Sequence, residues 1–379
     1  MALEIEKAEG VYLVDTSGKR YLDLISGIAV SNVGHRHPKV IAAIKDQLDK
    51  YMHLMVYGEY IQSPQVQLAK LLSSQLPDNL DSVYFVNSGS EAIEGAMKLA
   101  KRFTGRTEII SFQNAYHGST QGSLSIMGNE EFKNAFRPLL PDVRQIEYNN
   151  TEQLSQITER TACVVVETIQ GEAGAIVPDK NFLKHLSEQC KAKGALLIVD
   201  EIQSGFGRTG KLFAFEHYYI VPDIMCIAKG MGGGMPIGAF ISSKEIMNSL
   251  TSNPILGHIT TFGGHPVCCA AAYATLNVLL EEQLMGEVEE KEQLFRSLLR
   301  HSKIKSIHGK GLLLALEFEN YEENKKIIDI CIEKGVITDW FLFNSHSMRI
   351  APPLTISREE IKFACETIVA AINAAFNIV

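Results

Sequence analysis

The sequence predicts an α/β fold built on a mostly parallel sheet. Two short apolar runs, at residues 196–199 and 224–227, stop at polar positions, the first at Asp200 and the second just before Lys229. Apolar runs of this length, bounded by turn signals, are typical of buried parallel strands. Similar runs alternate with helical patterns along the chain, as expected where helices connect parallel strands. Asp200 and Lys229 are therefore expected at the carboxyl edge of the sheet, where open α/β sheets bind ligands.

Size and composition narrow the class of protein. The chain has 379 residues and a net charge of -8, with no cluster of lysine and arginine, which argues against nucleic-acid binding. Its longest apolar run, at residues 268–280, is shorter than the ~20 residues that span a membrane. No signal peptide is expected at the amino terminus. Seven cysteines without a CxxC pair indicate reduced thiols, a cytoplasmic protein and no metal site.

The first third of the chain predicts a hairpin, two helices and a strand that leads into a third helix. Residues 10–30 alternate around a turn, Pro38 begins a helix, and a second helix follows Pro64. The strand at 82–86 leads through Ser88, Gly89 and Ser90 into a helix expected from about residue 91 to 105. Amide groups at such a helix start can hold a phosphate, yet a simple serine cap explains the same residues. This turn alone does not distinguish the two.

Two further strands end in loops with polar side chains. The strand at 108–112 is followed by a loop with Tyr116 and His117, and the run at 162–166 ends at Glu167. From residue 303 onward the pattern changes to short alternating runs and helices, which indicates a second, α+β layer. We expect a large domain at residues 45–255 and a small domain formed by residues 1–44 and 256–379.

Two segments resemble binding motifs, one for a dinucleotide and one for a metal ion, but a structural role explains each of them better. The segment GFGRTG at 205–210 satisfies a dinucleotide fingerprint, but it neither follows a strand directly nor opens a helix. His35 and His37 have no third ligand at metal-binding spacing, so loop or helix-start histidines are expected.

One cofactor requires a lysine, a carboxylate, a phosphate-binding helix start and an aromatic side chain together. Pyridoxal phosphate (PLP) needs a lysine for its aldehyde, amide donors for its phosphate, a face on which its ring stacks, and a carboxylate at its pyridine nitrogen. A buried lysine is also costly unless it is neutral or covalently bonded. A simple salt bridge between Lys229 and Asp200 is the alternative.

The motifs NSGSEA, ETIQGEAG, VDEIQSGFGRTG, PDIMCIAKGMGGGMPIGA and TTFGGHP occur in this order. In these segments the chain resembles the class III (subgroup II) PLP-dependent aminotransferases of fold type I, the branch with acetylornithine, ornithine and 4-aminobutyrate aminotransferases. The resemblance runs nearly end to end. It implies a large domain with a mostly parallel seven-stranded sheet, a role in amino-acid metabolism such as arginine biosynthesis, and a homodimer. The implied reaction moves an amino group from an ω-amine donor to 2-oxoglutarate, giving an aldehyde and glutamate.

The resemblance also implies roles for residues around the cofactor. Lys229 would form the Schiff base and move the proton, and Asp200 would pair with the pyridinium nitrogen. The remaining implied contacts are Gln203 at the phenolic oxygen, Ser88, Gly89 and Ser90 at the phosphate, Thr261 at the phosphate of the partner subunit, Tyr116 stacked on the ring, and His117 beside it.

For the substrate, the resemblance implies that Glu172 pairs with Arg349 while the donor is bound and then releases it to bind a carboxylate. One position departs from the pattern, because Ser119 stands where the acetylornithine and ornithine enzymes usually have a carboxylate-binding arginine. A serine cannot form a bidentate carboxylate clamp. Arg137 or Arg144 could supply the charge, or the donor could differ, with 4-aminobutyrate or lysine as candidates. A PLP aminomutase of the glutamate semialdehyde type and a nicotinamide dehydrogenase using GFGRTG are the competing functions.

Overall fold

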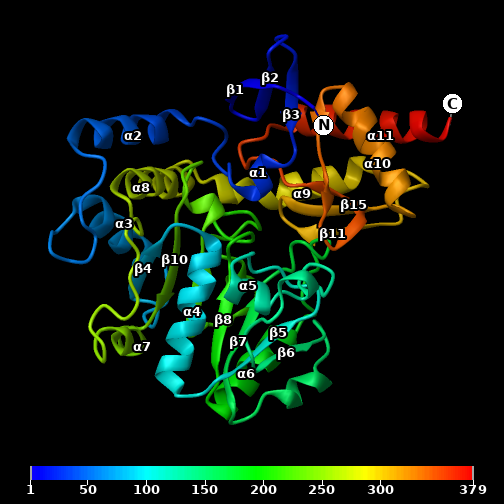
Figure 1. The fold of residues 1–379 in the computed structure, drawn as a ribbon. Coiled ribbons are helices and arrows are strands. Elements are labelled where there is room, and N and C mark those ends of the chain that lie inside the picture. The colour runs from blue at the N-terminus through cyan, green and yellow to red at the C-terminus, as the bar shows by residue number, and fades with distance from the viewer. Residues whose placement is uncertain (1, 378–379) are drawn as a thin grey trace.

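A seven-stranded sheet forms the centre of this computed structural model, which describes residues 2–377 (Figure 1). Six strands run in one direction, and only β10 is antiparallel to its neighbours β4 and β9. The strands, in their order across the sheet, are β4 (Ser82–Val86), β10 (Gly238–Ser242), β9 (Ile224–Ile227), β8 (Leu196–Asp200), β7 (Thr161–Glu167), β5 (Glu108–Phe112) and β6 (Val143–Ile146). The predicted α/β class with a mostly parallel seven-stranded sheet is confirmed.

The strands of this sheet are apolar on both faces because helices cover both. Successive side chains of a strand point to opposite faces. On β8, Ile198 packs in one core together with α4 (Gly89–Thr104), whereas Leu197 and Val199 belong to the core on the other side, with α6 (Phe182–Lys193). Figure 1 shows α4 lying along the sheet. Continuous apolar runs are therefore required, as the sequence shows.

A group of helices from distant parts of the chain packs beside this sheet. Helix α8 (Pro266–Glu281) contacts both α2 (Pro38–Lys50) and α3 (Ser63–Ser73). Helix α2 has proline at its start, where a missing N–H costs no hydrogen bond. The short helices are α1 (Ser26–Ala29), α5 (Gln121–Ser125) and α7 (Lys244–Met247), and the 3-10 turns are Asn134–Phe136, Glu152–Gln156, Ala214–Tyr218, Lys229–Met231, Asn248–Leu250 and Leu284–Glu287.

The two ends of the chain meet in a second region with two four-stranded sheets. The first contains β1 (Ile5–Glu9), β2 (Tyr12–Asp15), β3 (Arg20–Asp23) and β13 (Val336–Ile337). The second contains β11 (Ser306–Lys310), β12 (Leu313–Glu317), β15 (Asn344–Ile350) and β14 (Trp340–Phe341). Helices α9 (Val288–Leu298), α10 (Tyr321–Glu333) and α11 (Arg358–Phe376) pack around them. Because β3 pairs with β13, the amino-terminal hairpin lies with the carboxyl-terminal half; the domain limits at residues 44 and 255 stay a prediction.

The GFGRTG segment connects these regions through one arginine. The Arg208 side chain is fully buried and donates hydrogen bonds to the carbonyl oxygens of Leu312 (3.0 Å) and Pro352, and to Asn32 Oδ1. Its neighbour Gly207 has a φ of +86°, a conformation that favours glycine. The segment therefore forms a buried junction between the amino-terminal, central and carboxyl-terminal parts, which agrees with rejecting a dinucleotide site there.

Other elements begin close to where the sequence predicts them. Helix α4 starts at Gly89, about two residues before its predicted start, because the Ser88 hydroxyl accepts a hydrogen bond from Glu91 N (3.2 Å) and caps it. The His35 ring bonds to Asp23 (2.8 Å), and His37 precedes α2. Between residues 2 and 377, no helix is long and apolar enough to cross a membrane, and no group of three ligating side chains could hold a metal ion.

The contact between α4 and β10 gives a testable stability effect. A Cβ at Gly95 would overlap the ring of Phe240, so Gly95→Ala is expected to lower the free energy of unfolding by ~1–3 kcal/mol through overpacking. Gly286 has no neighbouring atom within 4 Å of such a Cβ, which makes Gly286→Ala the matched control. Urea unfolding measures both. Equal stability of the two variants would contradict this close packing of α4 on the sheet.

Candidate active site

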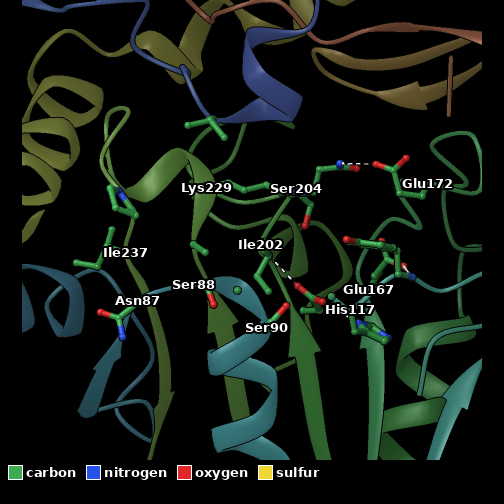
Figure 2. Close-up of a pocket in the computed structure, with 18 of the residues that line it drawn as sticks. Asn87, Ser88, Ser90, His117, Glu167, Glu172, Ile202, Ser204, Lys229 and Ile237 are labelled. Carbon is green, nitrogen blue, oxygen red and sulfur yellow. Dashed lines mark hydrogen bonds and ion pairs between the residues drawn. The ribbon is translucent and has the colours of Figure 1, made fainter. Parts of the chain in front are cut away.

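Loops from the carboxyl ends of five strands meet at one cavity of about 420 Å³. The strands are β4, β5, β7, β8 and β9, and the edge is the one where the sequence predicts ligand binding. Figure 2 shows Lys229, Glu172, Ser88, Ser90 and His117 around this space. The predicted residues that line it are Ser88, Gly89, Ser90, Tyr116, His117, Glu172, Asp200, Gln203 and Lys229.

Lys229 reaches the cavity directly after β9. Its backbone has a φ of +44°, which is unusual for a residue with a Cβ and marks a strained position. Burial lowers the pKa of its amine, although the charges of Glu172 and Asp200 act in the opposite direction. A neutral, nucleophilic amine is thus favoured compared with an ordinary lysine.

Asp200 ends β8 and is held in a fixed orientation. Its Oδ2 lies 2.7 Å from Nδ1 of the buried His117, and its Oδ1 accepts a hydrogen bond from Ile202 N at 2.9 Å. Burial opposes a charge on His117, but the hydrogen bond and the charge of Asp200 raise its pKa. These two contacts hold the Asp200 carboxyl group in place at the floor of the cavity.

Gln203 presents an oxygen that no protein donor reaches. Its Nε2 donates to Glu172 Oε1 (3.1 Å), while its buried Oε1 has no hydrogen-bond partner among residues 2–377. A Cβ at Gly171 would overlap this oxygen, so the glycine is needed for the close approach. His117 Nε2 is likewise buried without a partner. Buried unpaired atoms that line a cavity indicate a missing hydrogen-bonding ligand.

Arg349 on β15 is buried between two carboxylates. Its two terminal nitrogens donate to Glu172 (3.1 and 2.9 Å), and its Nε donates to Asp339 (2.9 Å). Burial opposes ionisation of Glu172, but the charge and hydrogen bonds of Arg349 lower its pKa to about 2. Leu342 N adds a further hydrogen bond to Glu172 (3.1 Å). The predicted pairing of Glu172 with Arg349 is thus formed in this structure.

The start of α4 faces the same cavity. Gly89 and Ser90 form its first turn, and Ile202 packs against Gly89, where a Cβ would meet Ile202 at 2.9 Å. Free amide groups and the positive end of the helix dipole favour an anion at this position. Together with the unpaired atoms elsewhere in the cavity, this favours a ligand site over a simple cap.

Besides Arg349, four residues named from the sequence do not line this cavity. Ser119 is exposed, with its Oγ 3.3 Å from the Tyr116 hydroxyl. Arg137 pairs with Glu130 and Arg144 with Glu108, and neither arginine lines the cavity. Thr261 is also exposed in this single chain.

Two carboxylates of the site were not assigned a role from the sequence. Glu167 ends β7, and its carboxylate accepts hydrogen bonds from Tyr116 N (2.9 Å) and Gly171 N (2.8 Å), so it holds both loops. Burial raises its pKa to about 7. Because Glu167 directly follows an apolar run, as Asp200 does, the sequence could have predicted it at the ligand-binding edge of the sheet. Asp339 gives no comparable signal, because it reaches Arg349 only through the fold of the β14–β15 hairpin.

A second cavity of about 680 Å³ adjoins the first. Both are lined by Tyr116, Glu172 and Lys229. The second cavity continues toward α10 and the β14–β15 hairpin, where its lining residues include Ile28, Ile328, Asp339, Trp340, Leu342 and Arg349. Space for a substrate therefore lies beside the lysine, between the central sheet and the carboxyl-terminal region.

Comparisons with known proteins agree with this geometry. The family model for class III aminotransferases matches residues 1–372. The acetylornithine aminotransferase of Methanopyrus kandleri is 39% identical over 370 residues, covering 97% of this chain and 93% of that protein. Two solved structures of the ornithine aminotransferase of Toxoplasma gondii, each 31% identical, have TM-scores of 0.93 and 0.92 and cover 100% of this chain and 92% of theirs. One of them has PLP at its active site in partial occupancy.

The matched family and the site geometry lead to the same conclusion, since a buried lysine, a fixed carboxylate and a helix start surround one cavity. The chain belongs to the class III aminotransferases and is a PLP-dependent enzyme.

Proposed function

We propose that this enzyme transfers the amino group of an ω-amine donor to 2-oxoglutarate, with PLP bound in the first cavity and covalently linked to Lys229. The observation that carries the proposal is a buried lysine with a lowered pKa, opposite a carboxylate fixed by a histidine, in one cavity. Acetylornithine and ornithine, named for the relatives, define the kind of donor: a primary amine at the end of a short chain.

The residues of the cavity fit this cofactor. The unpaired Gln203 Oε1 would accept a hydrogen bond from the phenolic hydroxyl of the cofactor, and the amides of Gly89 and Ser90 would donate to its phosphate. Asp200 suits the pyridine nitrogen, and Tyr116 suits a ring face. When bound, PLP supplies an electron sink and a carrier for the amino group.

Lys229 is the residue placed to move the proton. Its amine is neutral at lower pH than an ordinary lysine, so it can take a proton from the donor carbon and return it to the cofactor side. Asp200, held by its hydrogen bond with His117, would pair with the cofactor nitrogen.

Glu172 and Arg349 explain how one site accepts two kinds of substrate. While they are paired, Glu172 occupies the terminal nitrogens of Arg349, and a donor without a carboxylate at this position fits beside them. If Glu172 turns away, the two terminal nitrogens of Arg349 are free for a bidentate hydrogen bond with a carboxylate of 2-oxoglutarate. Asp339 stays on Nε and holds the guanidinium plane during the exchange.

An aminomutase of the same fold is the second candidate on sequence grounds. The matched relatives named here are aminotransferases, which favours transfer to an external acceptor. The two differ in one requirement, because a mutase turns over without added 2-oxo acid.

We propose a homodimer in which Thr261 completes the site of the partner subunit. In the single chain, Thr261 lies outside the cavity, and large apolar side chains are exposed in its segment, namely Ile255, Leu256, Ile259 and Phe262. Exposed apolar side chains gathered in one segment indicate a contact surface. A cytoplasmic location is also part of the proposal, since all seven cysteines are buried free thiols.

The role of Lys229 is testable by trapping the cofactor. Borohydride reduction of the PLP-loaded enzyme is expected to leave a stable adduct on Lys229, found by peptide mass spectrometry, and Lys229→Ala should abolish it. Lys211→Ala, which changes an exposed lysine, is the control. The reaction of PLP with the cofactor-free enzyme requires a neutral Lys229 amine. The rate of this reaction should therefore rise with pH, with a midpoint below the ordinary lysine pKa of 10.5. An adduct on another lysine, or titration at the ordinary value, would overturn the assignment.

The role of Thr261 is testable by mixing two variants. Thr261→Ala homodimers should bind PLP about tenfold more weakly through loss of one phosphate hydrogen bond. Mixed with Lys229→Ala, they form heterodimers in which one site combines an intact lysine with the intact threonine of the other chain. That site should regain native PLP affinity and activity. If mixing restores nothing while heterodimers form, Thr261 does not act across the interface.

A further inference from the structure

Each basic side chain that lines the second cavity is either paired with a carboxylate or assigned to PLP. Arg349 is bound by Glu172 and Asp339, and Lys325 pairs with Asp329 on α10. Lys229 is assigned to PLP. Within residues 2–377, therefore, the lining of this cavity leaves no basic side chain free for a carboxylate at the far end of a donor.

The net charge of Arg349 and its carboxylate partners is negative while Glu172 is paired with Arg349. One guanidinium faces two carboxylates, because Glu172 occupies its terminal nitrogens and Asp339 its Nε. Asp339 uses only Oδ1 in this contact, and no hydrogen bond in the described chain reaches its Oδ2. The Asp339 side chain retains 22% exposure and lines the cavity. One carboxylate oxygen is thus available to a ligand.

Much of the lining of the second cavity is apolar. Ile28, Ile328, Trp340 and Leu342 are among the residues that line it, together with Lys229 and Asp339. Apolar walls of this kind favour a chain of methylene groups. The cavity therefore combines the Lys229 amine, apolar side chains and an acceptor oxygen on Asp339.

We propose that Asp339 is a specificity-determining residue whose free oxygen binds a second ammonium group, so that α,ω-diamines are the preferred donors. The inference rests on the proposed function, because it assumes that the first amine reacts at Lys229. A charged hydrogen bond between the ammonium and Asp339 would compensate the excess negative charge beside Arg349. An N-acylated amino acid would instead bring its carboxylate toward Asp339, with Ser119 unable to bind it.

The wild-type enzyme tests this preference without any substitution. The PLP-loaded enzyme is mixed with each donor alone, and loss of the visible absorbance of the lysine-bound cofactor is followed by stopped flow. We expect 1,4-diaminobutane or 1,5-diaminopentane to react with a second-order rate constant about ten- to a hundredfold above those of n-butylamine, 4-aminobutyrate and N-acetylornithine, as for one charged hydrogen bond.

Asp339→Asn tests the residue itself. The substitution keeps an oxygen for Arg349 Nε and removes the charge, so the ratio of the diamine rate to the butylamine rate should fall about tenfold. Asp46→Asn, which removes the same charge from an exposed pair with Lys50, should leave the preference unchanged. Calorimetric titration of 1,4-diaminobutane into the Lys229→Ala variant, with and without Asp339→Asn, measures binding independently of turnover.

The outcomes separate the two claims. If no donor changes the spectrum, the proposed function fails. If carboxylate donors react and diamines do not exceed butylamine, the transaminase stands and the diamine inference is wrong. Diamine preference that persists unchanged in Asp339→Asn would overturn the role of Asp339, and should that variant be unstable, the wild-type comparison with butylamine still decides the donor class.

Discussion

A lysine amine buried at the end of β9 is the constraint on which the rest of the site depends. An uncompensated buried ammonium is costly, and the protein meets this cost by lowering the pKa of Lys229 and by placing Glu172 and Asp200 within range of its charge. The parallel sheet makes that arrangement possible, because the carboxyl ends of five strands lie at one edge. The proposed function uses the same geometry, with this amine as the nucleophile and the proton carrier.

In the proposed exchange, Glu172 can leave Arg349 only if another carboxylate takes its place. Removing one partner of a buried ion pair leaves an uncompensated charge, a change that typically costs about 3–5 kcal/mol. Glu172 is held by Arg349, Gln203 and Leu342 N, so its departure is tolerable only when a carboxylate replaces it. Asp339 keeps Arg349 in place but adds a second negative charge beside it. In the diamine proposal, the second ammonium group of the donor compensates this charge.

The sequence predicted those parts of the molecule whose signals are local. The strands at 82–86, 108–112 and 224–227 have the predicted bounds, because apolar runs and turn residues mark them directly. The family resemblance then predicted the sheet of seven strands. Strand β10 was not predicted, since Gly238–Ser242 is short and follows a glycine-rich turn that reads as loop. Asp339 was missed because its contact with Arg349 depends on the fold of a hairpin, and no residue pattern encodes that contact.

The most direct test of the account is a crystal structure of the PLP-loaded enzyme with 2-oxoglutarate bound. Continuous electron density from Lys229 Nζ to the cofactor, Asp200 at the pyridine nitrogen, and a carboxylate of 2-oxoglutarate on the terminal nitrogens of Arg349 with Glu172 turned away are the predicted result. Density joining the cofactor to a different lysine, or 2-oxoglutarate bound while Glu172 still pairs with Arg349, would contradict it.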